Sequence, residues 1–250
     1  MHLQDLKRII TEYTDGRPYV LAKDSDDGAS PYRIRMTSTV PSDVPLISGD
    51  FIYNVRSALD HLAAALNPPS RKRSVYFPIF WKGVWEPHVE GEDQGKANDR
   101  KKWTSSTRKM APQAVEILKL LQPDYDDNVG HSSERVVHYL DGINMLSNYD
   151  KHFEFPAVVA GIGQLRITYA LGGVAMEIID GRDWGMFKEG TPVPQIPTEA
   201  TNIEMDAKAR VVIRVTHPEG EVNIPDFFEH VLEMMRDRVA IPLSPYLYVS

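Results

Sequence analysis

The sequence predicts an α+β fold: a helical, bundle-like N-terminal half with a β-hairpin, then an antiparallel sheet and a C-terminal helix. Apolar residues have helical spacing through most of 48–152, short alternating segments with Gly-rich turns fill 155–216, and one amphipathic helix follows at 226–238. Helices and strands grouped in this way are typical of segregated layers, so one α+β domain over residues 1–250 is expected.

The first 40 residues predict a short helix and the β-hairpin. Apolar residues at positions 3, 6, 9 and 10 have helical spacing, and the pattern ends before Asp15-Gly16. The segments 19–22 and 32–37 are rich in strand-forming residues. They flank the turn-forming stretch 24–28, which indicates that they pair.

The segment from Phe51 to Leu66 predicts the first long helix. Ser48 is expected to cap it, Asp50 to favour its N-terminus, and Pro68-Pro69 to end it. Its buried face is expected to consist of apolar residues spaced three and four apart, namely Ile52, Val55, Leu59, Leu62 and Leu66.

Two more helices are expected after a strand-like segment at 75–80. One begins near Pro112 and ends before Pro123, and the other has Ser132 or Ser133 as its cap and reaches residue 152. The intervening stretch 70–110 holds ten Lys or Arg against five Asp or Glu. It is expected either to be a solvated, partly flexible insertion or to form a basic rim that attracts a phosphate-bearing ligand.

From residue 155 onward, five strands and a final helix are expected. The strands cover 158–160, 164–170, 174–179, 202–205 and 210–216, with Gly172-Gly173 as one turn and a Pro-rich loop at 191–197. The final helix is expected to have Asp226 as its cap and to run to about Arg238.

The composition excludes several classes of protein. With 42% hydrophobic residues, a chain of 250 residues can bury a core without disulfides, and the absence of cysteine excludes thiolate nucleophiles, zinc-thiolate sites and iron–sulfur clusters. The net charge of -7 argues against a protein that coats nucleic acid. With no apolar run of ~20 residues and no signal pattern at the start, a cytoplasmic protein without a membrane partner is expected.

Polar side chains are dense in the helix predicted at 51–66. Asn54, Ser57 and His61 share one helical stripe, while Arg56 and Asp60, four residues apart, form a neighbouring stripe. Both stripes lie away from the apolar face. A mixture of Asn, Arg and His indicates a functional site, whereas a solvated face with one helical ion pair is the structural alternative.

A second polar cluster, Asn148 to His152, ends the third long helix. Asn148 and His152 share one stripe, and Asp150 and Lys151 lie beside it. Cations at a helix C-terminus also suit the helix dipole, which is the structural explanation for Lys151 and His152. Since the two cluster-bearing helices should pack through their apolar faces, the two clusters are expected to converge in one site.

These segments resemble a widespread family of uncharacterised bacterial proteins with an Asn-Leu-Arg-Ser-Ala-Leu-Asp-His signature and a later Asp-Lys-His-Arg. The matching segments are Gly49 to Leu62, Phe77-Pro78-Ile79-Phe80, Leu121-Gln122-Pro123 and Asn148 to His152. The resemblance implies no established activity. The chain departs from the family pattern at Tyr53, in place of His, and at Phe153, in place of Arg, so the resemblance implies no role for those two positions.

A second resemblance concerns chemistry. Arg56 and His61, with four residues between them, are similar to the Arg-x4-6-His motif of HEPN domains, many of which are metal-independent ribonucleases that pair two motifs across a dimer. The resemblance implies that Arg56 holds the scissile phosphate with its guanidinium fork. It implies that His61 transfers a proton during attack by the RNA 2′-hydroxyl. The β-rich second half departs from the all-helical HEPN pattern.

Three functional classes remain open. They are HEPN-like RNA cleavage or phosphate-ligand chemistry by a possible homodimer, a small-molecule hydrolase or lyase with an anionic substrate, and a non-catalytic binding module that clamps anions. Across these classes the candidate catalytic residues are Arg56, Asp60, His61, Asp150 and His152, and the candidate substrate-binding residues are Asn54, Ser57, Asn148 and Lys151. No cofactor is expected. A metal site of His and Asp is chemically possible, but the His and Glu spacings typical of metal motifs do not occur.

Overall fold

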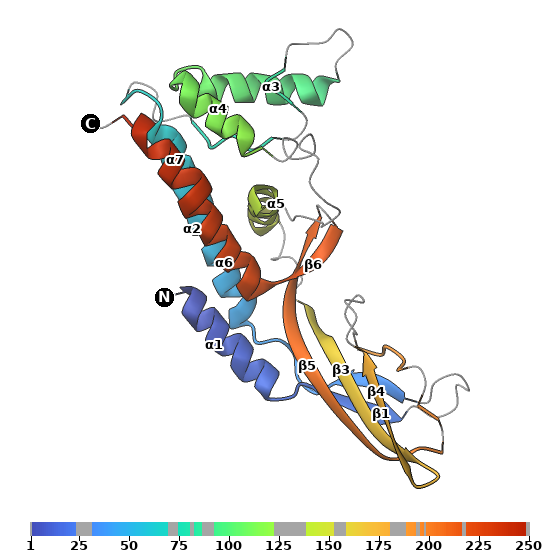
Figure 1. Ribbon diagram of the computed structural model, residues 1–250. Helices are drawn as coiled ribbons and strands as arrows, with labels where there is room; N and C mark the ends of the chain where they lie inside the picture. Colours follow the sequence, from blue (N-terminus) through green and yellow to red (C-terminus); the bar gives the residue numbers. More distant parts are fainter. Residues whose placement is uncertain are drawn as a thin grey trace. The chain divides into compact units, whose positions relative to one another are not determined.

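A computed structural model describes residues 2–23, 32–69, 75–80, 83–86, 93–122, 139–152, 159–180, 189–193, 196–197, 199–216 and 219–248. It confirms the α+β fold, with two antiparallel sheets (Figure 1). The chain forms two compact units. The first unit comprises Met1–Ser48, Pro156–Arg214 and Glu221–Pro225, and the second comprises Gly49–Phe155, Val215–Gly220 and Asp226–Ser250. No helix within the described ranges has both the length and the apolar character needed to cross a bilayer.

Helix α2 (Asp43–Ala65) begins earlier than the sequence predicts. Pro45 lies in its first turn, where backbone N–H groups have no helical partner and proline is therefore tolerated. Ser48 is consequently buried inside the helix and does not cap it, which corrects the expected start. The predicted apolar stripe is confirmed at four of its five positions, because Ile52, Leu59 and Leu66 are fully buried and Val55 is 7% exposed, whereas Leu62 is half-buried.

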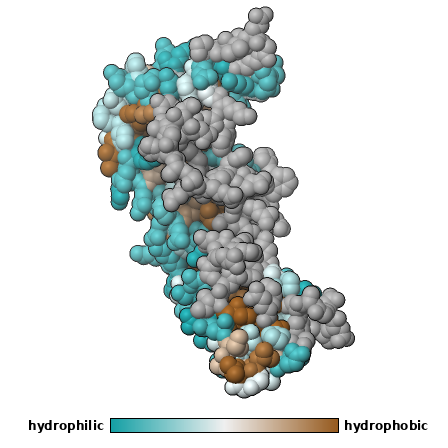
Figure 2. Space-filling model, turned by 45° about the vertical axis from the view of Figure 1, so that its right-hand side comes forward, coloured by the Kyte–Doolittle hydropathy of each residue, from teal (hydrophilic) through white to brown (hydrophobic). Residues whose placement is uncertain are grey.

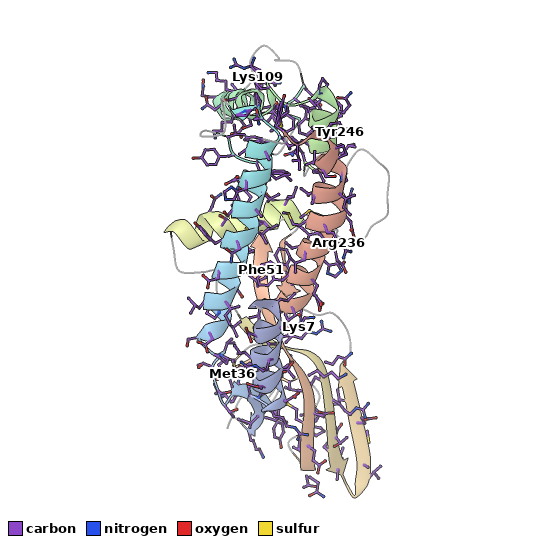
Figure 3. The ribbon with its side chains drawn as sticks, turned by 90° about the vertical axis from the view of Figure 1, so that its left-hand side faces the viewer. Lys7, Met36, Phe51, Lys109, Arg236 and Tyr246 are labelled. Atoms are coloured by element: carbon purple, nitrogen blue, oxygen red, sulfur yellow. The ribbon has the colours of Figure 1, made fainter. Side chains whose placement is uncertain are left out.

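A continuous helical run lies beside α2 (Figures 1 and 3). It consists of α6 (Ile224–Met234), the π-helix η3 (Met235–Ala240), α7 (Ile241–Leu243) and the 3-10 helix η4 (Ser244–Tyr246). Phe51 of α2 stacks on Phe228 of α6, with ring centroids 4.1 Å apart. Because α6 follows directly on a strand and begins at Ile224, Asp226 lies within its first turn and is not the cap that the sequence predicts.

The spacing of apolar residues in this run explains the π-helix η3. Four apolar residues lie four positions apart: Val231, Met235, Val239 and Leu243. In an α-helix, residues four positions apart differ in direction by about 40° around the axis, so a line of such residues drifts around the helix. A π-helix has more residues per turn than an α-helix, so it brings residues four positions apart back toward one side. The N–H of Ile241 accordingly donates to the carbonyl of Arg236, and Val239 and Leu243 are buried.

The charged stretch after residue 92 contains a capped helix, which corrects the flexible insertion considered from its composition. Helix α3 (Gln94–Thr107) starts at Asp93, whose carboxylate accepts hydrogen bonds at 3.0 and 3.1 Å from the N–H groups two and three residues later. Trp103 is buried, and its ring lies 6.4 Å from that of Phe80 and 5.5 Å from that of Trp85. A cap and one aromatic anchor therefore order a helix whose other side chains are mostly polar.

The next two helices agree with the sequence. Helix α4 (Pro112–Leu120) has proline at its first position, where the missing N–H costs nothing. Helix α5 (Tyr139–His152) carries the predicted apolar residues Leu140, Ile143 and Leu146, all buried. The expected caps Ser132 and Ser133 lie outside the described residues.

The larger sheet has the strand order β4-β3-β5-β6. Its strands are β3 (Val159–Leu171), β4 (Val174–Asp180), β5 (Thr201–Thr216) and β6 (Glu219–Asn223). Gly172 and Gly173 join β3 to β4 with φ values of 58° and 83°, as a two-residue hairpin turn requires. The predicted turn is therefore confirmed.

Strands β3 and β5 are each continuous, although the sequence predicts two strands for each. In β3 the pairing with β5 shifts between Ile162 and Gln164, so the glycine between them belongs to a bulge and not to a turn. In β5, Ala207 and Ala209 weaken the strand pattern because alanine has a low strand preference, yet both pair with β3. The polar strand β6 was not expected.

The smaller sheet pairs β1 (Tyr19–Lys23) with β2 (Tyr32–Met36), as predicted, and follows α1 (His2–Asp15). The predicted turn at 24–28 lies outside the described residues. The other edge of β2 bonds to the segment 189–193, since the N–H of Ile34 donates to Thr191 at 3.1 Å and the N–H of Val193 donates to Tyr32 at 2.9 Å. Ile34 of β2 and Leu6 of α1 are both fully buried.

Candidate functional site

Arg56 and Asp60 clamp the backbone of the segment 75–80. They lie one turn apart on α2 and form an ion pair, with 3.2 Å between Nη2 and Oδ1. Asp60 Oδ1 accepts a hydrogen bond from the Phe77 N–H at 2.8 Å, and Arg56 Nη2 donates to the Phe77 carbonyl at 3.2 Å. This pair, called here the α2 clamp, satisfies both backbone groups of one residue, as a neighbouring strand would.

Gln122 holds the next part of the same segment. Its buried side chain accepts from the Phe80 N–H at 2.8 Å and donates to the Pro78 carbonyl at 3.0 Å. The segment 75–80 is therefore bonded to side chains of α2 and of Gln122, two residues after α4, and it is not the strand that its sequence suggests. The parts of the family-like signature that contain Arg56, Phe77 and Gln122 are thus joined to one another.

The α2 clamp leaves little of Arg56 for a ligand. The side chains of Arg56 and Asp60 are 15% and 29% exposed, and Arg56 Nη2 already contacts Asp60 and Phe77. Nη1 is buried and has no hydrogen-bond partner in the described part of the chain. A phosphate that took the whole guanidinium fork would have to replace Asp60 and the Phe77 carbonyl, so this geometry favours a positioning role for Arg56.

His61 belongs to the other polar stripe of α2. His61 and Asn54 are exposed, Ser57 is half-buried, and Tyr53 beside them is 62% exposed. Considering only residues that the structure describes, no hydrogen bond engages the side chains of these three polar residues. Arg56 and His61 are five positions apart, which is about 140° around the helix axis, so α2 does not bring them to one point.

The second predicted cluster lies at the end of α5, in the second unit. Asn148 is exposed. The side chains of Asp150, Lys151 and His152 lie outside the part of the chain that the structure describes. Between the side chains that are described, no hydrogen bond or ion pair joins Asn148 to the polar stripes of α2, and the expected convergence of the two clusters stays a prediction.

Exposed cations lie on α3 and directly after its end. Lys101, Arg108 and Lys109 are exposed, and among the described residues none of them forms an ion pair, whereas Lys102 pairs with Asp99 at 3.1 Å. Lys101 and Arg108 are two turns apart and share one side of the helix. Figure 2 shows hydrophilic residues over α3, and Figure 3 shows Lys109 at the end that leads to α4. This basic end is suited to an extended anion.

Asn67 joins the ends of α2 and α3. Its buried side chain donates to the Ala63 carbonyl at 2.9 Å and to the Ser106 carbonyl at 3.3 Å. His61 precedes Asn67 by six positions, or about 9 Å along the helix axis. His61 and the basic end of α3 therefore occupy the same end of α2.

Two polar arrangements of the second unit are absent from the sequence-based prediction. Gln122 has partners that lie far away along the chain, which no local pattern reveals. Tyr139 of α5 stacks on His230 of α6 at 5.6 Å with nearly parallel rings, and burial, followed by the charge of Glu233, raises the pKa of Tyr139. His230 Nδ1 lies 2.6 Å from the Asp226 carbonyl. Both arrangements join elements by packing and hydrogen bonding.

The second unit thus presents an exposed imidazole at His61 and exposed cations at the end of α3. In the described residues no group of three or more His, Asp or Glu side chains is arranged to hold a metal ion. Comparison of the chain with protein family models, with curated proteins and with solved structures finds no match.

Proposed function

We propose that the second unit binds single-stranded RNA and cleaves it without a metal ion, with His61 as the group that transfers the proton. Lys101, Arg108 and Lys109 hold phosphates of the backbone. Arg56 is a positioning residue, which keeps α2 and the segment 75–80 in register through Asp60 and Phe77. This assignment keeps the chemistry that the HEPN resemblance implies, but it gives Arg56 a positioning role in place of phosphate binding.

The exposed imidazole of His61 carries the proposal. Imidazole gains and loses protons near neutral pH, as general acid–base catalysis requires. Asn54 and Ser57 on the same stripe supply an amide and a hydroxyl that hydrogen bond to ribose or phosphate oxygens. Tyr53, at 62% exposure, adds an aromatic surface on which a base can stack.

The basic end of α3 supports RNA more than a small substrate. Single-stranded nucleic acid is bound by grooves or lines of cations that follow the backbone, together with aromatic stacking. Lys101, Arg108 and Lys109, which have no ion-pair partner among the described residues, match several successive phosphates, whereas a small anion needs only one or two. Binding of this kind weakens as salt rises, because condensed counterions are released.

The proposed reaction needs two proton transfers. His61 takes the proton of the 2′-hydroxyl, the 2′-oxygen forms a bond to phosphorus, and the bond from phosphorus to the 5′-oxygen breaks. The leaving 5′-oxygen receives a proton from a second imidazole, which in a homodimer is His61 of the other copy. The product is a 2′,3′-cyclic phosphate, and no metal ion takes part.

The direct test uses the full chain with single-stranded RNA of mixed sequence in the presence of EDTA. Cleavage that leaves cyclic or 3′-phosphate ends is expected, and DNA of the same sequence should stay intact because it lacks the 2′-hydroxyl. Binding without cleavage would overturn the catalytic part of the proposal and leave a non-catalytic RNA-binding protein. Absence of binding at low salt would overturn both parts and favour a small anionic substrate.

His61→Ala tests the catalytic group. The cleavage rate is expected to fall by a factor of about 100 or more, while RNA affinity and the unfolding temperature stay close to those of the wild type. His230→Ala is the matched control, because His230 is also exposed but lies on α6, outside the proposed site. Equal cleavage rates for the two variants would contradict a catalytic role for His61.

A charge-reversal variant tests the phosphate contacts. Replacing Lys101, Arg108 and Lys109 by Glu should reduce the slope of log affinity against log salt by about 2, since roughly 0.7 counterions are released per phosphate contact. The control replaces three exposed cations of the first unit by Glu, namely Lys23, Lys208 and Arg210. An equal loss of binding in the control would show that net charge, and not the end of α3, attracts the RNA.

A further inference from the structure

The first unit contains a hollow of about 610 Å³ on the polar face of its larger sheet, a volume within the usual range for small-molecule sites. Leu165, Ile167 and Tyr169 of β3 are buried on one face. The residues between them point to the opposite face, where Arg166 lies across from Asp206 and Thr168 across from Glu204. The hollow is lined by Arg17, Arg166, Thr168, Glu204, Met205 and Asp206.

Charges of both signs line the hollow, and most of them have no partner among the described residues. Arg166 turns toward β4, where its Nε lies 3.5 Å from Glu177, although Asp206 is its direct neighbour across the strands. Within the described residues, the side chains of Arg17, Glu204 and Asp206 have no hydrogen-bond or ion-pair partner. Glu204 and Asp206 are about 6.6 Å apart along β5, so both carboxylates can reach one cationic group.

Arg17 has a left-handed backbone conformation, which is uncommon for a residue with a side chain. It follows α1 with φ of 50°, in the left-handed region that glycine prefers. Gly16 stands beside it, yet the left-handed position holds an arginine whose side chain lines the hollow. Strained backbone conformations cluster at ligand-binding and active sites. The strain and the hollow are independent observations that point to the same place.

We propose that this hollow binds a small zwitterion, a free amino acid or a short peptide with free termini. Glu204 and Asp206 bind its ammonium group, and Arg17 binds its carboxylate. A purely anionic ligand would be repelled by two carboxylates, and a metal cation would be repelled by Arg17 and Arg166. A ligand with one charge of each sign satisfies both sets of groups. This site lies within the first unit and is independent of the proposed RNA chemistry.

Glycine, glycylglycine and triglycine are suitable probes, because the distance between their charged ends increases in that order. Each is titrated into the ¹⁵N-labelled full chain, and the amide resonances of residues 166–168 and 204–206 are followed. Saturable shifts are expected with at least one probe. For that probe, N-acetylation or C-amidation should weaken binding at least about tenfold, because each removes one charged partner. No saturable shift with any probe, or equal binding of the capped forms, would overturn the proposal.

Two variants test the residues without endangering the fold. Arg17→Gly removes the guanidinium and suits the left-handed backbone, so it should fold at least as well as the wild type. Asp206→Asn keeps the size of the side chain and removes its charge. Each should weaken binding about tenfold. Lys208→Gln, exposed on the same strand but outside the hollow, is the control and should bind as the wild type does. Wild-type affinity in both site variants would contradict the assignment.

Discussion

Asp60 Oδ1 accepts a hydrogen bond from the Phe77 N–H at 2.8 Å, while Arg56, ion-paired with Asp60, donates to the Phe77 carbonyl. Side chains of a helix thus replace the backbone of a partner strand. Val75, Phe77 and Ile79 are each at most 8% exposed, and such burial requires that the backbone groups between them be bonded. The α2 clamp is therefore a condition for packing the segment 75–80 into the core.

Asp60→Ala should destabilise the protein strongly. It leaves the Phe77 N–H without an acceptor and the half-buried Arg56 guanidinium without its counter-charge, so the free energy of unfolding is expected to fall by about 2–4 kcal/mol. Asp60→Asn keeps an oxygen for the Phe77 N–H, and the expected loss is about 1–2 kcal/mol. Urea-induced unfolding measures both changes.

The control for this pair is Asp50→Asn, an exposed position on the same helix, where a change below about 0.5 kcal/mol is expected. Arg56→Lys keeps the charge but loses the guanidinium nitrogen Nη2, which contacts both Asp60 and Phe77. Its loss of unfolding free energy should lie between that of the control and that of Asp60→Ala. If Asp60→Ala were as stable as the control, the clamp would have no energetic importance.

Gln122→Ala should lower the free energy of unfolding by about 2–3 kcal/mol, because it leaves the part-buried Phe80 N–H and the buried Pro78 carbonyl without partners. Gln122→Glu is more informative. A carboxylate still accepts from the Phe80 N–H but faces the Pro78 carbonyl, whereas a protonated carboxyl can donate to it. The stability deficit of Gln122→Glu relative to the wild type should therefore be smaller at pH 4 than at pH 7. A deficit independent of pH would contradict the donor role of the amide.

The lowered pKa of Glu189 predicts that the folded protein loses stability in acid. The hydrogen bond from the Met36 N–H, and then the Arg35 guanidinium, hold the pKa of Glu189 below its ordinary value of 4.5. A lowered pKa means that the unfolded chain binds the proton more tightly. The contribution of Glu189 is thus complete above about pH 4.5 and is lost as the pH falls below it. The difference in Tm between the wild type and Glu189→Gln should be constant from pH 6 to 8 and shrink below pH 4.5. If the full difference persisted at pH 3, protonation of Glu189 would not be coupled to folding.

The raised pKa of Tyr19 predicts that the folded protein loses stability in alkali. Burial raises the pKa of Tyr19, and burial also raises the pKa of Tyr13, whose hydroxyl donates to the Ser38 carbonyl at 3.1 Å. Both phenols stay neutral in the folded protein at pH values where the unfolded chain ionises them. Stability is therefore unaffected below about pH 10 and falls as the pH rises further. Tyr19→Phe should make the fall in Tm above pH 10 less steep, and an unchanged alkaline profile would argue against a buried, neutral Tyr19.

Local patterns predict those elements whose determinants are close together in sequence. The apolar stripe of α2, the hairpin β1–β2, the start of α4 at Pro112 and the Gly172-Gly173 turn each depend on residues within one or two turns or on adjacent positions. Backbone sterics and helical spacing act over that range, so the sequence is sufficient for them.

Elements that depend on distant partners are predicted less well. Gly161 and Gly163 look like interruptions of a strand, but pairing with β5 across a bulge makes β3 continuous. The stretch at 94–107 looks like a solvated insertion, but the burial of Trp103 against Phe80 and Trp85 anchors it as a helix. In both cases bonds or contacts from elsewhere in the chain outweigh the local preference.

For the candidate site, the sequence by itself determined that Asn54, Arg56, Ser57, Asp60 and His61 lie away from the apolar face of one helix, because helical spacing alone sets that arrangement. Only the tertiary structure decided which of them have partners. Asp60 and Arg56 bond to Phe77, 17 and 21 residues further along the chain, while His61 stays exposed to solvent. The periodicity of a helix specifies the direction of a side chain but not what another segment places there, so the division between clamp and open stripe comes from the packing of the segment 75–80.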